Sequence, residues 1–340
     1  MKASLSILAL AAAATTLPAA AQFVTVGDAG NPNDQDYSGQ AQFGAVATSY
    51  AIGTYEVTLN QYTAFLNAVA ATDTYALYNT SMASDLNSAG IARANSPGSY
   101  TYSVIGSGAR PVTYVSFYDA MRYANWLGSG STETGTYTLL GGTEVPSNGL
   151  TVARNGGAQV WIPSENEWYK AAYYQPAAAG GDADGYWLYP TGSNAIPNSR
   201  SGSVSDANSG NFYRDDAVAN GFNGGLAVTN STSYSGTQNY LTDAGAFTQA
   251  DSYYGTFDQG GNVWEWNDTI IGSSRGLRGG SWDYRESYLQ AGPRYFDVGP
   301  KSEYDYVGFR VATVPEPTAA VSLIFAGGLL LSRRKRPSAL

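Results

Sequence analysis

The chain has no cysteine and no histidine among its 340 residues, and these two absences exclude several chemistries. Without cysteine there is no thiolate nucleophile, no disulfide and no cysteine-ligated copper, zinc or iron–sulfur site. Without histidine there is no imidazole base and no histidine-ligated metal. We therefore expect no copper, zinc or iron. Carboxylates, hydroxyls, Lys, Arg and oxygen ligands for a hard cation such as Ca²⁺ remain.

Residues 1–21 have the features of a cleaved secretory signal peptide. Lys2 precedes a short apolar run, and the small residues at 19–21 stand directly before Gln22. An ordinary membrane anchor is the alternative, but the run is shorter than the roughly 20 residues that a spanning helix needs. We expect signal peptidase to remove this segment and the mature chain to be exported.

The C-terminal segment 314–340 combines the sequence Val-Pro-Glu-Pro, an apolar run at 319–331 and a basic cluster at 333–336. In this order the three parts resemble the PEP-CTERM sorting signal. The resemblance implies transient attachment to the inner membrane and processing by an exosortase. Release would be to the cell surface or extracellular matrix of a Gram-negative bacterium that produces exopolysaccharide. The alternative is a hydrophobic tail without a sorting role, because the run is too short to span a bilayer.

Removal of both ends makes the chain strongly acidic. Five of the 18 Lys and Arg residues lie in these ends, which leaves 13 basic residues against 27 acidic ones if Glu316 is kept. A negative surface repels phosphate backbones and anionic lipids. We therefore expect no nucleic-acid partner for the mature protein.

The middle of the chain reads as one large domain with three helices and several short extended runs. Each predicted helix starts with Thr or Ser, followed three residues later by Gln, Asp or Glu, which is the capping-box spacing. The helices are expected at 58–71, 116–128 and 164–174, and extended runs at 50–58, 158–163 and 306–312. The region 177–251 is rich in Gly, Ser, Asn and Asp, and its sequence predicts no particular element.

Six motifs stand in a fixed order over roughly residues 50–312: YEVTLNQYTAFLNA, RPVTYVSFYDAMRYANWLG, VWIPSENEWYKAA, YYGTFDQGGNVWEWNDT, RGLRGGSW and VGFRVA. Together they resemble the formylglycine-generating enzyme, or sulfatase-modifying factor, family. That resemblance implies an α+β domain with a modified C-type-lectin-like fold and much irregular structure. We place this domain at 22–313.

The same resemblance places two copper-binding cysteines of the family at Tyr284 and Leu289. Neither a phenol nor an isobutyl group replaces a soft thiolate pair for Cu(I). Related sulfoxide synthases hold iron through histidines, which this chain lacks. We therefore expect neither chemistry and a non-catalytic role. An enzyme of the family that works through carboxylates and tyrosines stays open as the alternative.

The family also implies a structural calcium ion at the turn DQGGNVWEW. Its ligands would be the side chains of Asp258 and Glu265 and the backbone carbonyls of Gly261 and Val263, all of which offer oxygen donors. Asn211 would begin a second calcium site whose other ligands cannot be placed. In the alternative interpretation, the two carboxylates accept local backbone N–H groups and the tryptophans of the turn are core residues.

The region 283–306 is where the family presents its substrate groove, and here it is rich in Tyr and Arg. We predict ligand contacts from Tyr284, Arg285, Tyr288, Arg294 and Tyr295, since such side chains are favoured at binding surfaces. The alternative is that half of the tyrosines in this region pack the core and the arginines pair with Glu286, Glu303 or Asp305. The leading hypothesis is a secreted, surface-sorted binding or matrix protein whose ligand is an exopolysaccharide or another protein. A purely structural protein that associates with itself is a third option.

The calcium hypothesis predicts a chelator-sensitive fold. Purified residues 22–314 should contain calcium and no copper, and a chelator should lower the melting temperature because the ion binds the folded state alone. Metal analysis coupled to thermal unfolding checks this. Stoichiometric copper would overturn the argument from Tyr284 and Leu289, and absence of both metals would leave the turn as a packing motif.

Overall fold

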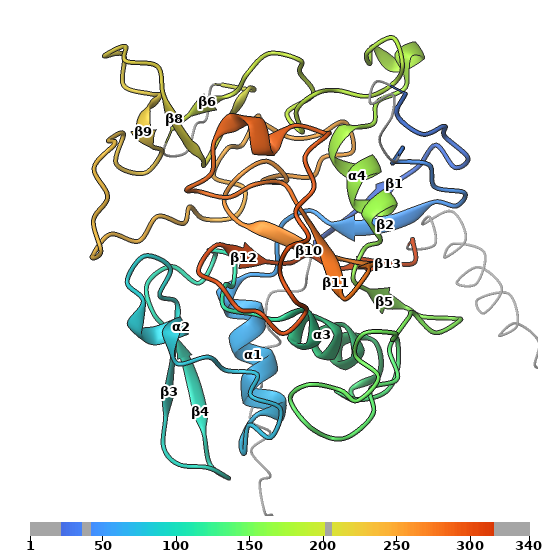
Figure 1. Ribbon diagram of the computed structural model, residues 1–340, viewed down its shortest axis with the longest axis vertical. Helices are drawn as coiled ribbons and strands as arrows, with labels where there is room; N and C mark the ends of the chain where they lie inside the picture. The colour runs from blue at the N-terminus through green and yellow to red at the C-terminus, as the bar shows by residue number, and fades with distance from the viewer. Residues whose placement is uncertain (1–21, 36–41, 201–205, 316–340) are drawn as a thin grey trace, which may run out of the picture.

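The computed structural model describes residues 22–35, 42–200 and 206–315 (Figure 1). The predicted signal peptide and residues 316–340 of the predicted sorting signal lie outside the described residues. Within the described ranges, no helix is long and apolar enough to cross a bilayer.

A four-stranded antiparallel sheet brings together segments from both ends and the middle of the domain. Its order is β1-β2-β13-β5, so the last strand lies between the second and the fifth. Two of the three predicted extended runs supply β2 and β5, and the third, 306–312, contains β12 (Val307–Gly308) of the second sheet and ends at the first residue of β13. The strands are β1 (Phe23–Val26), β2 (Tyr50–Gly53), β5 (Val160–Trp161) and β13 (Ala312–Thr313).

A second sheet of three strands lies at the centre of the molecule (Figure 1). Its middle strand, β10 (Trp264–Ile271), pairs antiparallel with β11 (Ser274–Arg278) and parallel with β12 (Val307–Gly308). Because β10 directly follows the turn predicted to hold calcium, the sheet fixes that turn from one side.

The three predicted helices are confirmed as α1 (Leu59–Val69), α3 (Phe117–Ser129) and α4 (Glu165–Tyr173), each with a complete capping box. The predicted end of α3 at Gly128 is wrong by one residue. Gly130, rather than Gly128, takes the left-handed C-cap conformation with φ 77°, and it accommodates that conformation without steric cost. In Figure 1, α1 and α3 lie below the central strands and α4 lies above them.

The remaining described chain is mostly irregular. A hairpin of β3 (Ile91–Ala94) and β4 (Thr101–Val104) follows the short α2 (Ser81–Ser84). The region 177–251 contains a 3₁₀ turn, η1 (Ala177–Ala179), and the short strands β6 (Asn198–Ser199), β7 (Ser209–Gly210), β8 (Tyr213–Asp215) and β9 (Gly224–Leu226). A further 3₁₀ turn, η2, covers Glu286–Leu289. The mixed composition confirms the predicted α+β class.

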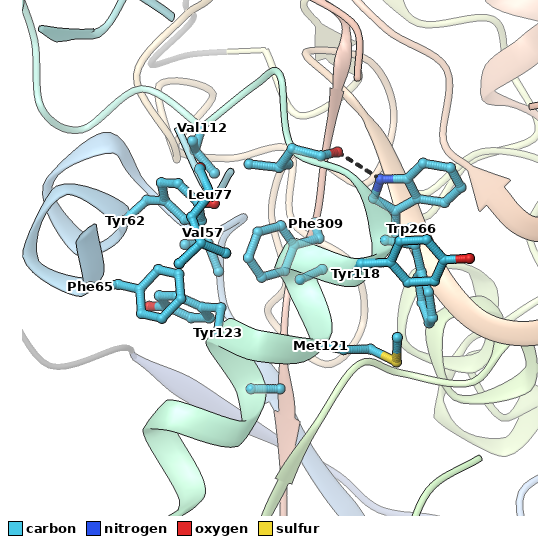
Figure 2. Packing of buried hydrophobic residues seen from close by; sticks show 14 of the residues in the cluster. Val57, Tyr62, Phe65, Leu77, Val112, Tyr118, Met121, Tyr123, Trp266 and Phe309 are labelled. Atoms are coloured by element: carbon cyan, nitrogen blue, oxygen red, sulfur yellow. Dashed lines mark hydrogen bonds between the residues drawn. The ribbon is translucent and has the colours of Figure 1, made fainter. Parts of the chain in front are cut away.

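The largest hydrophobic core lies between the two lower helices and the central sheet (Figure 2). Tyr123 of α3 packs edge-on against Phe65 of α1 and Phe309, with ring centroids 5.4 and 5.3 Å apart. Trp266 of β10 is fully buried, and its indole N–H donates to the carbonyl of Val115 at 3.0 Å. Aromatic side chains therefore join the helices to the sheet.

A buried ion pair connects the two sheets. The Arg310 guanidinium donates to both carboxylate oxygens of Glu265 in β10, each at 2.6 Å, and both side chains are fully buried. The same guanidinium donates to the carbonyls of Gly53 and Phe257 at 3.0 Å. Arg310 therefore connects three separate segments of the chain.

Removal of Arg310 should strongly destabilise the fold. Arg310→Leu leaves Glu265 buried without its counter-charge, so we expect the free energy of unfolding to fall by about 3–5 kcal/mol. Urea unfolding followed by circular dichroism measures this. The matched control is Arg200→Leu, because Arg200 is 33% exposed and lies 3.9 Å from Asp206; it should change stability by about 1 kcal/mol or less. Equal effects of the two substitutions would contradict the proposed role of the buried pair.

Candidate functional site

Three tyrosine rings pack against the indole of Trp264 at the start of β10, and a fourth packs against one of the three. The ring centroids of Tyr284, Tyr288 and Tyr295 lie 5.4, 6.0 and 5.6 Å from that of Trp264, and Tyr306 lies 5.8 Å from Tyr284. We call these five residues the Trp264 cluster. Trp264 is fully buried, whereas Tyr288 is 40% exposed. Three of the five predicted ligand-binding residues are therefore brought together, with one ring facing solvent.

The segment that carries these tyrosines is anchored at Leu289, the last residue of η2. Leu289 is 1% exposed and packs with Tyr189 and Phe212. Its carbonyl accepts the hydroxyl of Tyr173 at 3.0 Å. The position that the resemblance assigns to the second copper ligand is therefore filled by a buried apolar side chain.

The two predicted binding arginines do not belong to the Trp264 cluster. Arg285 lies with its guanidinium 5.3 Å from the ring centre of Tyr213. Arg294 forms a two-point ion pair with Glu165, which also pairs with the fully buried Arg278 at 2.7 Å. The alternative that Arg294 pairs with Glu286, Glu303 or Asp305 is therefore wrong about the partner, because Arg294 pairs with Glu165 of α4.

The two carboxylates of the predicted calcium turn accept hydrogen bonds from other protein groups in this structure. Glu265 accepts both Arg310 donors and the indole N–H of Trp168 at 2.8 Å. Asp258 accepts the backbone N–H of Gly245 at 2.6 Å. The alternative interpretation is correct that Trp264 and Trp266 are core residues, but the donors to the two carboxylates are side chains and a distant backbone N–H rather than local backbone groups.

The turn lies directly against Asn211, the residue predicted to begin the second calcium site. Gly261 has φ 96°, and a Cβ there would lie 2.3 Å from the carbonyl oxygen of Asn211, so glycine is required. Asn262 donates its backbone N–H to that oxygen at 2.7 Å and accepts the Asn211 side-chain amide at 3.0 Å. Val263 is fully buried beside them. The structure therefore brings the two predicted sites together.

Sequence reasoning missed Glu56, which faces the same turn. Glu56 is 1% exposed, accepts the Asn262 amide at 3.1 Å, and leaves its other oxygen without a partner. Burial and then the charge of Asp258 raise the pKa of Glu56 well above its usual range. No group of three acidic side chains with metal-binding geometry is found over the described ranges. With Glu265 held by Arg310, calcium at this turn would rely on Asp258, Glu56 and backbone carbonyls, and it stays a prediction.

Three aspartates that were not predicted to lie together are near the Trp264 cluster. Asp283 precedes Tyr284, Asp305 precedes Tyr306, and Asp85 follows α2 and accepts the hydroxyl of Tyr114. Burial, followed by the charges of Asp85 and Asp283, raises the pKa of Asp305 from 3.8 to about 6. These neighbouring carboxylates therefore repel one another at neutral pH.

Two pockets in the described part of the protein lie away from these groups. The larger, about 640 Å³, is lined by the loop 145–151 together with Tyr118 and residues 299–301. The smaller, about 250 Å³, lies between Arg154, Glu167 and the chain at Val314. The predicted ligand residues thus form a surface of rings rather than part of either pocket.

The architecture defines an α+β domain whose short strands and irregular loops are joined by buried arginines and aromatic clusters. A family model described as "Sulfatase-modifying factor enzyme 1-like domain" matches residues 14–314, and the chain therefore belongs to that family. The match begins inside the predicted signal peptide and extends beyond the 50–312 region that carries the motifs.

Solved structures with a similar fold include variable protein 1 of Treponema denticola and CarF. The first is 20% identical, with 86% of this chain and 95% of that chain covered and a TM-score of 0.51. The second is 20% identical, with 87% and 99% covered and the same TM-score. At this identity the likeness shows the fold alone. None of the curated proteins matches the chain.

Replacement of Asp305 should change how stability depends on pH. The pKa of Asp305 is higher in the folded protein than in the unfolded chain. Between about pH 4 and pH 6 this carboxyl group is therefore ionised in the unfolded chain but still largely protonated in the folded protein, so its contribution to stability falls as pH rises. Asp305→Asn removes this loss, so its melting temperature should exceed that of wild type increasingly over that interval and by a constant amount above it. Calorimetry at a series of pH values tests this. The exposed Asp297→Asn is the control, and an identical pH profile for both variants would refute the assignment.

Proposed function

We propose that this chain is an exported, surface-sorted binding protein that uses the sulfatase-modifying scaffold without the oxidase chemistry of the family. The observation that carries the proposal is the filling of the two copper-ligand positions. Leu289 is buried among aromatic rings, and Tyr284 packs edge-on against Trp264. Both side chains are committed to packing, and neither offers a soft donor for copper.

The exposed part of the Trp264 cluster supports a role in binding. Tyr288 presents a large ring to solvent, and its position is fixed by contacts at 5.0 Å to Tyr284 and 6.0 Å to Trp264. A fixed aromatic side chain loses little conformational entropy when a ligand arrives. A polysaccharide or protein surface fits such an exposed site, and the acidic composition disfavours nucleic acid.

The two chain ends support an extracellular location. A signal peptide at 1–21 would direct export, and the PEP-CTERM-like segment 314–340 would attach the chain to the inner membrane until an exosortase processes it. The mature protein would then reside at the cell surface or in the matrix, where an exopolysaccharide is the natural ligand class. A structural calcium ion at the 258–265 turn belongs to the same proposal.

A second candidate, an enzyme that works through carboxylates, is favoured by one observation. Burial and the charge of Asp119 raise the pKa of Glu303 to about 8, and Glu303 also hydrogen-bonds to that carboxyl. A carboxyl group that holds its proton at neutral pH can act as a general acid. This pair lies at the N-terminus of α3, however, where Asp119 forms part of the capping box of that helix.

Truncation of the exposed tyrosine tests the binding proposal. Tyr288→Ala should release most of the protein from exopolysaccharide prepared from the producing cells, by about tenfold in retained fraction, because it removes the exposed ring. Tyr253→Ala is the matched control, since Tyr253 is 43% exposed and contacts Tyr254 rather than the Trp264 cluster. Cosedimentation of the protein with the polysaccharide measures the effect.

The same protein should be incubated with copper, oxygen and a cysteine-containing sulfatase peptide. Conversion of the peptide thiol at a rate that depends on this chain would overturn the non-catalytic proposal. Equal retention of both tyrosine variants would instead remove the Trp264 cluster from the binding site.

A further inference from the structure

Three nearly parallel rings form a strip next to the Trp264 cluster. Tyr240 and Trp282 stack with centroids 4.8 Å and planes 5° apart, and Tyr234 stacks on Tyr240 at 5.7 Å and 20°. We call these three residues the Trp282 stack. Tyr240 and Trp282 are buried, whereas Tyr234 is 61% exposed. Tyr306 packs against this stack and belongs to the Trp264 cluster, so the two groups are continuous.

Hydrogen bonds fix the position of Tyr234, the exposed ring of the Trp282 stack. The hydroxyl of Tyr234 donates to the side-chain oxygen of Asn87, whose amide donates to the carbonyls of Ser235 and Gln238 at 2.8 and 2.9 Å. The hydroxyl of Tyr240 accepts the backbone N–H of Ser235 at 2.8 Å. A solvent-facing aromatic side chain with its position fixed in this way is preorganised for a ligand.

The three aspartates described above lie near this exposed ring: Asp85 accepts the backbone N–H of Asn87, which holds the Tyr234 hydroxyl, and Asp283 directly follows Trp282. After burial, the charges of Asp85, Asp305 and Asp283 all contribute to raising the pKa of Tyr234. In the part of the chain that the structure covers, none of the three aspartates forms an ion pair with Lys or Arg. The closest arginine in sequence, Arg285, lies over the ring of Tyr213 instead. The negative charge at Tyr234 therefore lacks a protein counter-charge.

A polar donor beside this surface is also unused. The indole N–H of Trp282 is buried, with the residue 3% exposed, and it has no hydrogen-bond partner among the described residues. An unpaired buried donor is unfavourable unless something supplies an acceptor. The stack thus combines aromatic faces with uncompensated carboxylates, beside a buried donor that lacks an acceptor.

We propose that the Trp282 stack and the three aspartates bind an amino-sugar chain that carries free ammonium groups. The inference rests on the proposed binding function and names its ligand class. The apolar face of a pyranose ring stacks on the exposed face of Tyr234, and an ammonium group is attracted both by aromatic faces and by the carboxylates of Asp85, Asp283 and Asp305.

The observations favour this ligand over two others. A neutral polysaccharide would use the rings but would leave the mutual repulsion of the aspartates in place. A basic peptide would satisfy the charges, but its flexible side chains do not match a flat strip of rings as well as sugar rings do. Both alternatives become outcomes of the test.

The test compares three probes by isothermal titration with the mature protein. A glucosamine hexasaccharide carries both rings and ammonium groups, N-acetylglucosamine hexasaccharide carries the rings without charge, and hexalysine carries the charge without sugar rings. The proposal expects the glucosamine chain to bind at least about tenfold more tightly than either of the others. Added salt should weaken the binding of the glucosamine chain, because the attraction includes exposed charges.

Two substitutions and two controls assign the binding to this surface. Tyr234→Ala and Asp305→Asn should each weaken binding of the glucosamine chain by about tenfold, and Asp305→Asn should hardly change binding of the acetylated chain. Tyr253→Ala and Asp297→Asn, exposed residues elsewhere, should leave both affinities unchanged. Circular dichroism confirms that each variant is folded.

Each other result overturns the inference. Equal affinity for the acetylated chain would make the surface a neutral-sugar site, and equal affinity for hexalysine would make it a basic-peptide site. If folded wild-type protein binds none of the probes, the amino-sugar assignment is refuted. In that case the wider proposal of a binding protein still holds if Tyr288→Ala lowers retention on the native polysaccharide. If Tyr288→Ala has no effect either, both the amino-sugar assignment and the wider binding proposal fail.

Discussion

The buried pair of Glu265 and Arg310 is the interaction on which the rest of this structure depends. It joins the middle strand of the central sheet to the chain just before β13, and through the carbonyls of Gly53 and Phe257 it also fixes the end of β2 and the approach to the 258–265 turn. Five donors in one rigid plane allow a single side chain to meet all of these acceptors. The pair also places a fixed positive charge beside the turn where the family resemblance implies a cation.

Other buried arginines extend the same solution into the loops. Arg275 donates to the carbonyls of Asp268 and Val152, and Arg122 donates to those of Thr143 and Glu144, all from fully or nearly fully buried positions. An irregular chain leaves many carbonyls without a ladder partner, and each needs a donor when it is buried. Without disulfides to fasten its loops, this chain uses guanidinium groups to connect them.

The sequence predicted the three helices because capping residues and apolar spacing are local signals. It located β2, β5 and β12 through their short apolar runs, but not β1 or the two long strands β10 and β11 of the central sheet. The partners of Glu165 and Glu265 were not predictable, because Arg294 and Arg310 approach them from distant parts of the chain. The grouping of the aspartates near Tyr234 was not predictable for the same reason: Asp85 comes from a different part of the chain than Asp283 and Asp305, and their charges meet only in the folded protein. The region 177–251 gave no local signal because side-chain amides such as that of Asn223, bonded to Ser199, replace regular pairing.

The loops and the Trp264 cluster are held by different kinds of interaction, and this has a consequence for how they respond to temperature. The rings of the Trp264 cluster rely on apolar burial, whose benefit per unit area levels off on heating. The arginine pairs that tie the loops respond differently, because the cost of removing ions from water falls as temperature rises. On heating, the arginine contacts between sheets and loops should therefore weaken less than the packing of the aromatic rings. Heat should loosen the Trp264 cluster before it separates the loops from the sheets.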